Sequence, residues 1–320
     1  MPPASTGALI CILCVALVTA PFASAQWRTA QDALICIAGT GAQSLDIAVC
    51  GRALRRAGLS DLDRASVLTA RGKAYRESGE LAAALTDFEA ALILNPYSAN
   101  AFNQRALVLE ESGHHERALE NFRSALALSP RFAAAYKNRG MAQFFAGNLI
   151  RAGFDLDAAL ALARDDAEIF AFRGFLHYLA GRYRDAADDF QRAHALSLPY
   201  PYLPLWRYLA GTGSGDAARG ELVEARAGLL PGEWPQPLLD VYLGELYPET
   251  LIATLEGADR SPGRQRRLAA SHYYLAALER LNGRRGRALS HLAKTMALSE
   301  RRMPERVLAK HELAAVSQSH

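Results

Sequence analysis

Side chains that could carry out chemistry are few in this sequence, and their spacing matches no catalytic motif. The stretch from Gly211 to Gly215 is glycine-rich, but it lacks the Lys-Ser/Thr pair of a phosphate-binding loop and does not fit a hydrolase nucleophile elbow. His114 and His115 are adjacent, so they cannot share the helix face that two metal ligands need. The other histidines considered have no Ser, Asp or Cys partner at a readable spacing, namely His177, His194, His272 and His291. We therefore predict a protein that is not an enzyme and that needs no metal or cofactor.

The N-terminal segment indicates export. Residues 7–20 are uncharged and apolar, Pro21 ends the run, and Ala23-Ser24-Ala25 places small residues where a signal peptidase reads them. We expect a signal peptide over residues 1–25, cleaved after Ala25, and a periplasmic or secreted protein. The less favoured alternative is an uncleaved membrane anchor, since the 19 residues from Gly7 to Ala25 are marginal for a span and include a proline.

Two of the four cysteines remain after such a cleavage. Cys36 and Cys50 form an even pair, which in an exported chain is typical of a disulfide. Closing a loop of this length stabilises by about 3 kcal/mol in the chain-entropy model. The alternative is two buried free thiols that act as small apolar side chains. The spacing is not Cys-x-x-Cys, so we predict no redox function.

Composition favours an α-helical chain with a buried core. Of the 320 residues, 50% are hydrophobic and 22% are charged, Ala and Leu dominate, and β-branched residues are sparse. This excludes a β-sandwich or a collagen-like chain. The net charge of +3 is too small to indicate an obligate nucleic-acid binder, although residues 257–310 hold 13 Lys/Arg against 4 Asp/Glu.

A period of 34 residues runs through the centre of the chain. Five columns repeat in phase over four consecutive units, and each column keeps one kind of residue. The columns are Gly72, Ala106, Gly140 and Gly174; Gly79, Gly113, Gly147 and Gly181; Ala84, Ala118, Ala152 and Ala186; Phe88, Phe122, Leu156 and Phe190; and Ala91, Ala125, Ala159 and Ala193.

Each column has a physical reason. The columns of Gly72 and Ala84 are small because two antiparallel helices approach closely there, and the Phe88 column fills the space between units. The Gly79 column ends the first helix, since glycine tolerates the left-handed conformation that such a stop needs. Pro96 and Pro130 prevent the second helix from continuing in the first two units. Each unit is therefore helix, turn, helix, and neighbouring units must stack to bury their apolar faces.

This pattern resembles the tetratricopeptide repeat (TPR). The match covers residues 65–200 as four units, at 65–98, 99–132, 133–166 and 167–200. The resemblance implies an all-α fold, a right-handed TPR superhelix (α-solenoid) of antiparallel helix pairs.

Helical segments are predicted on both sides of these units. Residues 26–64 form an N-terminal helical cap, with helices at 28–38 and 45–57 linked by the cysteine pair. Residues 201–320 form a C-terminal helical region with a degenerate helix pair at 201–228. A further TPR-like unit is predicted at 269–302, because Ala276, Gly283, Ala288 and Leu292 lie three periods after Gly174, Gly181, Ala186 and Phe190.

The C-terminal half is similar to the NlpI-like family, which are periplasmic repeat lipoproteins that act as adaptors around cell-wall hydrolases and a protease. The similarity lies in Leu205-Trp206-Arg207-Tyr208-Leu209, Trp234-Pro235, Val241-Tyr242-Leu243-Gly244-Glu245, Thr250-Leu251 and Tyr273-Tyr274-Leu275. The chain departs from that family in lacking a lipid-attachment cysteine and in carrying the cysteine-linked cap.

The first helices of stacked repeats line a concave face, which repeats of this kind use to hold peptide segments. We predict that this groove is lined by Lys73, Asn103, Lys137, Met141, Phe144, Phe175 and Tyr178. The alternative is that the C-terminal half packs over the aromatic residues, since large apolar patches are rarely left bare.

These features predict a non-catalytic protein–protein interaction scaffold or adaptor in the bacterial cell envelope. Its partners would be protein or peptide segments, with envelope enzymes among them, and not nucleic acid. The second interpretation is a self-associating assembly factor, a homodimer whose groove is filled by its own C-terminal half. A basic cluster could contact an anionic surface or could simply be solvated, and it comprises Arg264, Arg266, Arg267, Arg284, Arg285 and Arg287.

Overall fold

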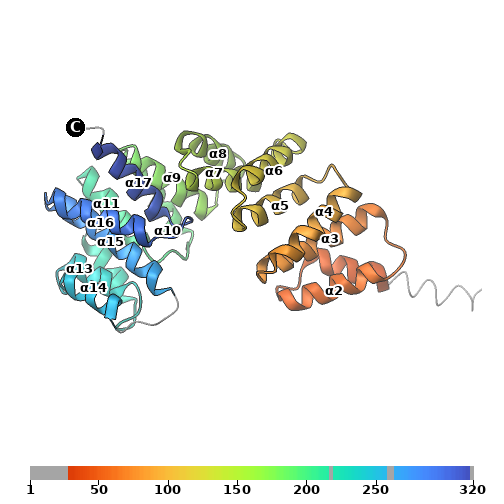
Figure 1. Cartoon of the computed structure of the whole chain (residues 1–320), viewed down its shortest axis with the longest axis horizontal. Helices are drawn as coiled ribbons and strands as arrows, with labels where there is room; N and C mark the ends of the chain where they lie inside the picture. Colours follow the sequence, from red (N-terminus) through yellow and green to blue (C-terminus); the bar gives the residue numbers. More distant parts are fainter. Residues whose placement is uncertain (1–27, 216–218, 258–262, 318–320) are drawn as a thin grey trace, which may run out of the picture. The chain divides into compact units, whose positions relative to one another are not determined.

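The computed structural model describes residues 28–215, 219–257 and 263–317. All regular secondary structure in these ranges is α-helical (Figure 1), which confirms the predicted all-α fold. The chain divides between Ala135 and Tyr136 into two compact units, here called unit 1 and unit 2, and each is described by itself. None of the described helices is long and apolar enough to span a membrane. The predicted signal peptide, residues 1–25, lies outside the described residues.

Unit 1 contains the cap and the first two repeats. A helix over residues 28–38 comes first. The helices that follow are α2 (Gln43–Arg55), α3 (Asp61–Glu77), α4 (Leu81–Leu94), α5 (Ala99–Glu111) and α6 (His115–Leu128). Each of α2 to α5 packs against the next helix along the chain, so the unit is a stack of antiparallel helices.

Unit 2 contains the remaining repeats and the C-terminal region. Its helices are α7 (Ala133–Phe145), α8 (Leu149–Leu162), α9 (Ala167–Leu179), α10 (Tyr183–Ala195), α11 (Leu203–Ser214), α12 (Arg219–Ala227), α13 (Gln236–Leu243), α14 (Pro248–Gly257), α15 (Arg264–Leu281), α16 (Arg285–Leu298) and α17 (Pro304–Ser317). The helix α17 packs against α9, α15 and α16, so the end of the chain returns to an earlier repeat.

The columns of the repeat have the structural roles that their residue types predict. Gly79, at the turn between α3 and α4, has φ +82°, and its counterparts Gly113, Gly147 and Gly181 also have positive φ. A Cβ atom on Gly72 would lie 2.8 Å from Cε1 of Phe88, which is closer than real Cβ contacts. The Phe88 ring therefore lies directly over glycine within the same unit, and it also packs against Val108 of the next one.

The cap is held together by the cysteine pair. A disulfide joins Cys36, in the helix over residues 28–38, to Cys50 in α2. Both cysteines are buried, and they share a small apolar cluster with Val49 of α2 and Val67 of α3. The cap thus packs on the first repeat through the disulfide itself. The second cap helix begins two residues earlier than predicted, at Gln43.

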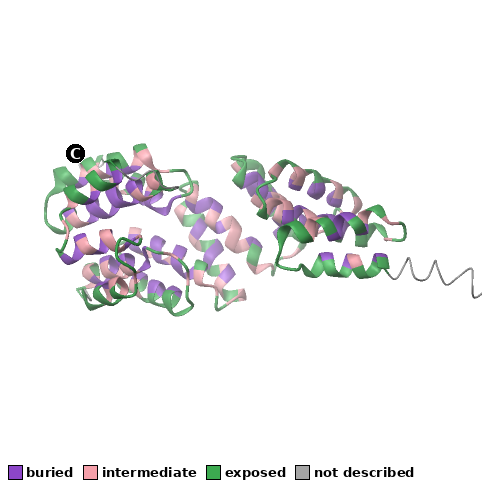
Figure 2. Cartoon of the chain, turned by 90° about the horizontal axis from the view of Figure 1, so that it is seen from below, coloured by how far each residue is buried: buried purple, intermediate pink, exposed green. Residues whose placement is uncertain are grey.

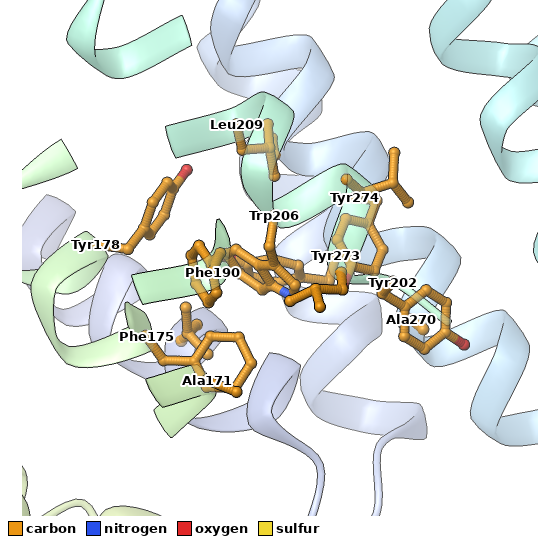
Figure 3. Packing of buried hydrophobic residues seen from close by; sticks show 14 of the residues in the cluster. Ala171, Phe175, Tyr178, Phe190, Tyr202, Trp206, Leu209, Ala270, Tyr273 and Tyr274 are labelled. Atoms are coloured by element: carbon orange, nitrogen blue, oxygen red, sulfur yellow. The ribbon is translucent and has the colours of Figure 1, made fainter. Parts of the chain in front are cut away.

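The core of unit 2 is aromatic and centres on Trp206 of α11. Its indole is fully buried and contacts the rings of Phe190 on one side and of Tyr273 and Tyr274 on the other (Figure 3). These rings come from α10, α11 and α15, so the core joins segments that are far apart in sequence. In both units the buried residues lie on the faces where helices of that unit pack together (Figure 2).

Candidate functional site

A polar cavity of about 440 Å³ lies along α3 and α5 in unit 1. Its wall is rich in hydrogen-bonding side chains. The lining residues are Cys36, Ile37, Ala38, Gly39, Asp46, Ser66, Thr69, Ala70, Lys73, Ala74, Glu77, Ser98, Asn100 and Gln104. The cavity lies on the first helices of two successive repeats, which is where the sequence predicts a binding groove.

The side chains of α3 and α5 give this cavity both donors and acceptors. The ammonium of Lys73 is exposed, and its Nζ lies 3.8 Å from Oε1 of Glu77. Oε1 of Gln104 is buried and accepts no hydrogen bond from the residues that the structure describes. Asn103, which the sequence placed in the groove, is buried with 1% of its surface exposed, whereas Asn100 is exposed in the cavity wall.

The cap closes one end of the cavity. The helix over residues 28–38 ends there, and residues 36–39 line the wall. Oδ1 of Asp46 accepts a hydrogen bond from the backbone N–H of Thr40 at 2.7 Å, which fixes the loop between the two cap helices. Because Cys36 is both a lining residue and half of the disulfide, the covalent link also determines the shape of this end.

In unit 2 the aromatic residues of the predicted groove are buried by the chain itself. Phe144, Phe175 and Tyr178 have 0%, 2% and 6% of their surface exposed. The ring of Phe175 packs against Phe190 and Trp206, with centroids 5.3 Å and 5.0 Å away (Figure 3). A partner that reached these side chains would have to displace internal contacts.

Tyr178 is also hydrogen-bonded to the C-terminal region. Nη2 of Arg280, in α15, donates to the Tyr178 hydroxyl at 2.7 Å, and the same guanidinium forms an ion pair with Glu312 of α17. Burial raises the pKa of Tyr178, so the hydroxyl stays neutral and accepts this bond. Arg280 of α15 therefore connects Tyr178 of α9 with Glu312 of α17.

The other two predicted groove residues of unit 2 are also engaged internally. Nζ of Lys137 lies 2.8 Å from Oδ2 of Asp166 and 2.9 Å from Oε2 of Glu168. Burial alone would lower the pKa of Lys137, but the hydrogen bonds to Asp166 and Glu168 outweigh burial and raise it. Met141 is partly buried against the aromatic core. Contact of these residues with a partner stays a prediction.

Family models for the tetratricopeptide repeat match unit 1. A model described as a TPR repeat matches residues 72–113, and one described as a tetratricopeptide repeat matches residues 99–132. Residues 72–132 are tetratricopeptide repeats. The match includes all of α4, α5 and α6 and the C-terminal end of α3, from residue 72 to residue 77. The cavity lies on α3 and α5.

Solved structures similar to this chain share little sequence identity with it. The APC/C hetero-tetramer Cut9–Hcn1 contains a chain that is 18% identical with a TM-score of 0.53, and the alignment covers 87% of this chain and 47% of that one. This chain therefore spans about half the length of that one. PilF of Pseudomonas aeruginosa is 18% identical with a TM-score of 0.49, over 80% of this chain and 100% of that one. A TPR protein from Parabacteroides merdae is 16% identical with a TM-score of 0.49, over 91% and 99%. No curated protein sequence matches.

A buried polar pair recurs in every one of the four TPR units, and the sequence analysis missed it. In unit 1, Nε and Nη2 of Arg71 each donate to the carboxylate of Asp87 at 2.7 Å, which joins the two helices of the repeat. The same pair recurs at intervals of 34 residues as Arg105–Asn121, Arg139–Asp155 and Arg173–Asp189. The 34-residue spacing of the arginines and of their Asp or Asn partners is the signal in the sequence that could have revealed these pairs.

In the last helix pair Leu275 stands in the arginine column, and two histidines join the helices instead. His272 and His291 lie three periods after Phe170 and Asp189, and their Nδ1 atoms are 2.9 Å apart between α15 and α16. His272 is buried, and burial together with the neighbouring His291 lowers its pKa to about 4. The pair is therefore neutral at pH 7, with one Nδ1–H that donates to the other Nδ1.

Several of the predicted basic residues are held by the chain. Nε of Arg264 donates to the carbonyl of Leu255, and the Arg267 guanidinium lies over the Trp234 ring, 5.9 Å from its centroid. Arg284 lies 3.4 Å from Oε1 of Glu279. Contact with an anionic surface stays a prediction. Among the described residues, no group of three or more His, Cys, Asp or Glu side chains could hold a metal ion.

Proposed function

We propose that the chain is a non-catalytic scaffold that holds a segment of a partner protein in the cavity of unit 1. TPR repeats are typical of protein–protein interaction, and the first helices of adjacent repeats form the surface used. The observation that supports this location is the open, polar wall of α3 and α5. The predicted groove residues of unit 2, in contrast, are engaged within their own unit.

The lining residues indicate a polar partner segment. Lys73 can donate to a carbonyl or carboxylate, the amide of Asn100 can both donate and accept, and Oε1 of Gln104 lacks a donor in the described part of the chain. An extended peptide offers backbone N–H and C=O groups that match this mixture. The segment would run along the first helices of the two repeats, with one end facing the cap.

The setting that we propose is the bacterial cell envelope, with envelope enzymes among the partners. Support comes from the apolar run with Ala23-Ser24-Ala25 and from the Cys36–Cys50 disulfide, which suits an oxidising compartment. N-terminal sequencing of protein from fractionated cells tests this. We expect a mature chain that begins at Gln26 in the envelope fraction, and a chain that begins at Met1 in the cytoplasm would contradict it.

Site-specific crosslinking tests the binding surface. A photoreactive residue at Asn100, in the cavity, should crosslink a partner from envelope extracts. The same residue at Glu89, exposed on α4 outside the cavity, is the matched control and should not. Lys73→Glu should remove the crosslink at Asn100. Equal capture at both positions, or capture that Lys73→Glu leaves unchanged, would show that the cavity is not the site.

A second candidate function is a self-associating assembly factor. It is favoured by the way in which α15 and α17 of the same chain engage Tyr178 and cover the inner face of α9. Sedimentation velocity at several protein concentrations distinguishes the two. A stable dimer that captures no partner favours assembly, and a monomer favours the scaffold.

A further inference from the structure

The outer surface of α8, in unit 2, carries two large apolar side chains that face solvent. Ile150 and Phe154 have 78% and 73% of their surface exposed. They lie four residues apart on one helix, so their side chains are neighbours on the same face. Together they form an apolar ridge on the second helix of the third TPR unit, which is not one of the first helices that form the binding groove of such repeats.

The repeat itself does not require apolar residues at these two positions. The equivalent pairs in the other helix pairs are small or polar, and all are exposed. They are Ala82 and Thr86, Glu116 and Glu120, Arg184 and Asp188, and Gly286 and Ser290. Since solvent contact favours polar side chains, the ridge is a local departure of the third unit and not a consequence of the fold.

A second departure lies between the two ridge residues. Gly153 occupies a column in which the other helix pairs have Leu85, Leu119, Ala187 and Leu289. A Cβ atom on Gly153 would meet Leu176 of α9 at 3.7 Å, an ordinary contact, so no close packing requires glycine there. The missing leucine side chain leaves a notch within a cavity of about 570 Å³ between α8 and α9, and Leu149, Leu176 and Leu179 form its apolar wall.

The unpaired charge at the rim of this notch is positive. Asp157 is the acidic residue that lines the cavity, and its Oδ1 lies 3.4 Å from Nη1 of Arg173, whose Nε and Nη2 donate to Asp189. Arg182 also lines the cavity, is exposed, and forms no ion pair with the described residues. His177 and His311 complete the polar rim. An acidic ligand would therefore meet one guanidinium, that of Arg182, which forms no ion pair with the described residues.

We propose that this notch binds an acidic amphipathic segment of a partner protein. A large apolar side chain of the segment enters the space above Gly153, between Ile150 and Phe154, and a carboxylate of the segment pairs with Arg182. Three adjacent departures from the columns of the repeat, two exposed apolar residues and one missing leucine, produce the surface. It is separate from the cavity of unit 1, so the protein could hold two partner segments at once.

A designed peptide probe tests this on the full chain. The probe is a fluorescein-labelled 14-residue helix with leucine at positions spaced i, i+3, i+4 and i+7 and glutamate elsewhere, and its matched partner carries lysine in place of glutamate. Fluorescence anisotropy at low salt should show saturable binding of the acidic peptide only. Arg182→Glu should weaken binding of the acidic peptide at least fivefold and should strengthen binding of the basic one.

Gly153→Leu is the decisive variant because it fills the notch with the residue that other units have. It should weaken acidic-peptide binding at least tenfold without loss of helical circular dichroism or of melting temperature, since leucine favours a helix more than glycine does. Phe154→Glu should weaken binding to a similar extent. Thr86→Glu, at the position of Phe154 in the first unit, is the matched control and should leave the affinity unchanged.

Four results would overturn the proposal. They are equal affinity for the acidic and basic peptides, absence of saturable binding by either, and unchanged affinity in Gly153→Leu. The fourth is concentration-dependent self-association in sedimentation velocity that Phe154→Glu abolishes, because the occupant would then be a second copy of this chain.

Discussion

The His272–His291 pair should make the stability of unit 2 depend on pH. The unfolded chain binds a proton on His272 below its ordinary pKa of 6.5, whereas the folded chain does so only near 4. Between these values the unfolded state holds more protons, so the free energy of unfolding falls as the pH is lowered from about 6.5 towards 4. Each pKa unit corresponds to about 1.4 kcal/mol, which sets a ceiling of about 3 kcal/mol for this residue.

Solvent contact and nearby charges reduce the expected effect. His291 is only partly buried, and burial and Lys294 lower its pKa as well, while Glu279 and Glu249 oppose that shift and Arg287 adds to it. We expect a loss of about 2 kcal/mol between pH 7.5 and pH 4.5. Urea unfolding at the two values, followed by circular dichroism, measures it.

A double variant isolates the histidine contribution. His272→Phe with His291→Asn restores residue types found in these columns in the TPR units, where Phe102 and Asn121 stand. The variant should lose less stability on acidification than the native chain, by about 2 kcal/mol. His194→Gln, on the exposed face of α10, is the matched control and should behave as the native chain does.

The comparison with the double variant is needed because a buried carboxylate acts in the opposite direction. Burial raises the pKa of Glu305, whose Oε1 accepts from the hydroxyls of Tyr200 and Tyr274. That residue contributes stability which is lost as the pH rises through its folded pKa, so acidification favours folding there. Equal acid sensitivity in the native chain and the double variant would refute the role of the histidine pair.

Three further predictions concern stability. Asp155→Ala removes the acceptor of a half-buried arginine and should cost about 2–4 kcal/mol in urea unfolding, whereas Glu120→Ala on an exposed face should change stability by less than about 0.5 kcal/mol. Gly174→Ala places a Cβ 2.7 Å from the Phe190 ring and should lower the free energy of unfolding by about 1–3 kcal/mol. In the control Gly286→Ala the new Cβ meets nothing within 4 Å, so the stability should not change. Equal melting temperatures of the two variants would refute close packing at Gly174. Reduction of the cap disulfide should cost about 3 kcal/mol, and an unchanged thermal transition with reductant present would contradict that.

The repeats could be predicted from the sequence because the residue type in each column is set by packing within a single repeat unit. The glycine at Gly79 ends α3 with a positive φ, and the small residue at Gly72 admits the Phe88 ring. Both requirements lie within one 34-residue unit, so one sequence suffices to recognise them. The Arg71–Asp87 pair is equally periodic but escaped notice, because charged residues are usually solvated and only the fold shows that this carboxylate is 4% exposed.

The fate of the unit 2 aromatics could not be predicted, because it depends on contacts between distant segments. Tyr178 is engaged by Arg280, which lies 102 residues later, and Phe175 packs on Trp206 of α11. The columns of the repeat specify how a unit packs on its neighbour, and they contain no information on a C-terminal helix that returns to α9. The exposed aromatic groove and the self-filled one therefore remained alternatives until the fold was known.

A repeat protein offers an internal comparison that a single globular domain lacks. Where a residue agrees with its column, the fold explains it, as at Gly113 or Ala118. Where a residue differs from its column and the difference does not improve packing or stability, the fold does not explain that residue. Gly153 gives up the helix propensity and the buried area of a leucine, and Phe154 leaves an aromatic ring in water, so both reduce stability relative to the residues that their columns provide. These two losses of stability lie next to each other and beside Arg182, which forms no ion pair with the described residues. A ligand that buries the exposed apolar surface when it binds would account for both.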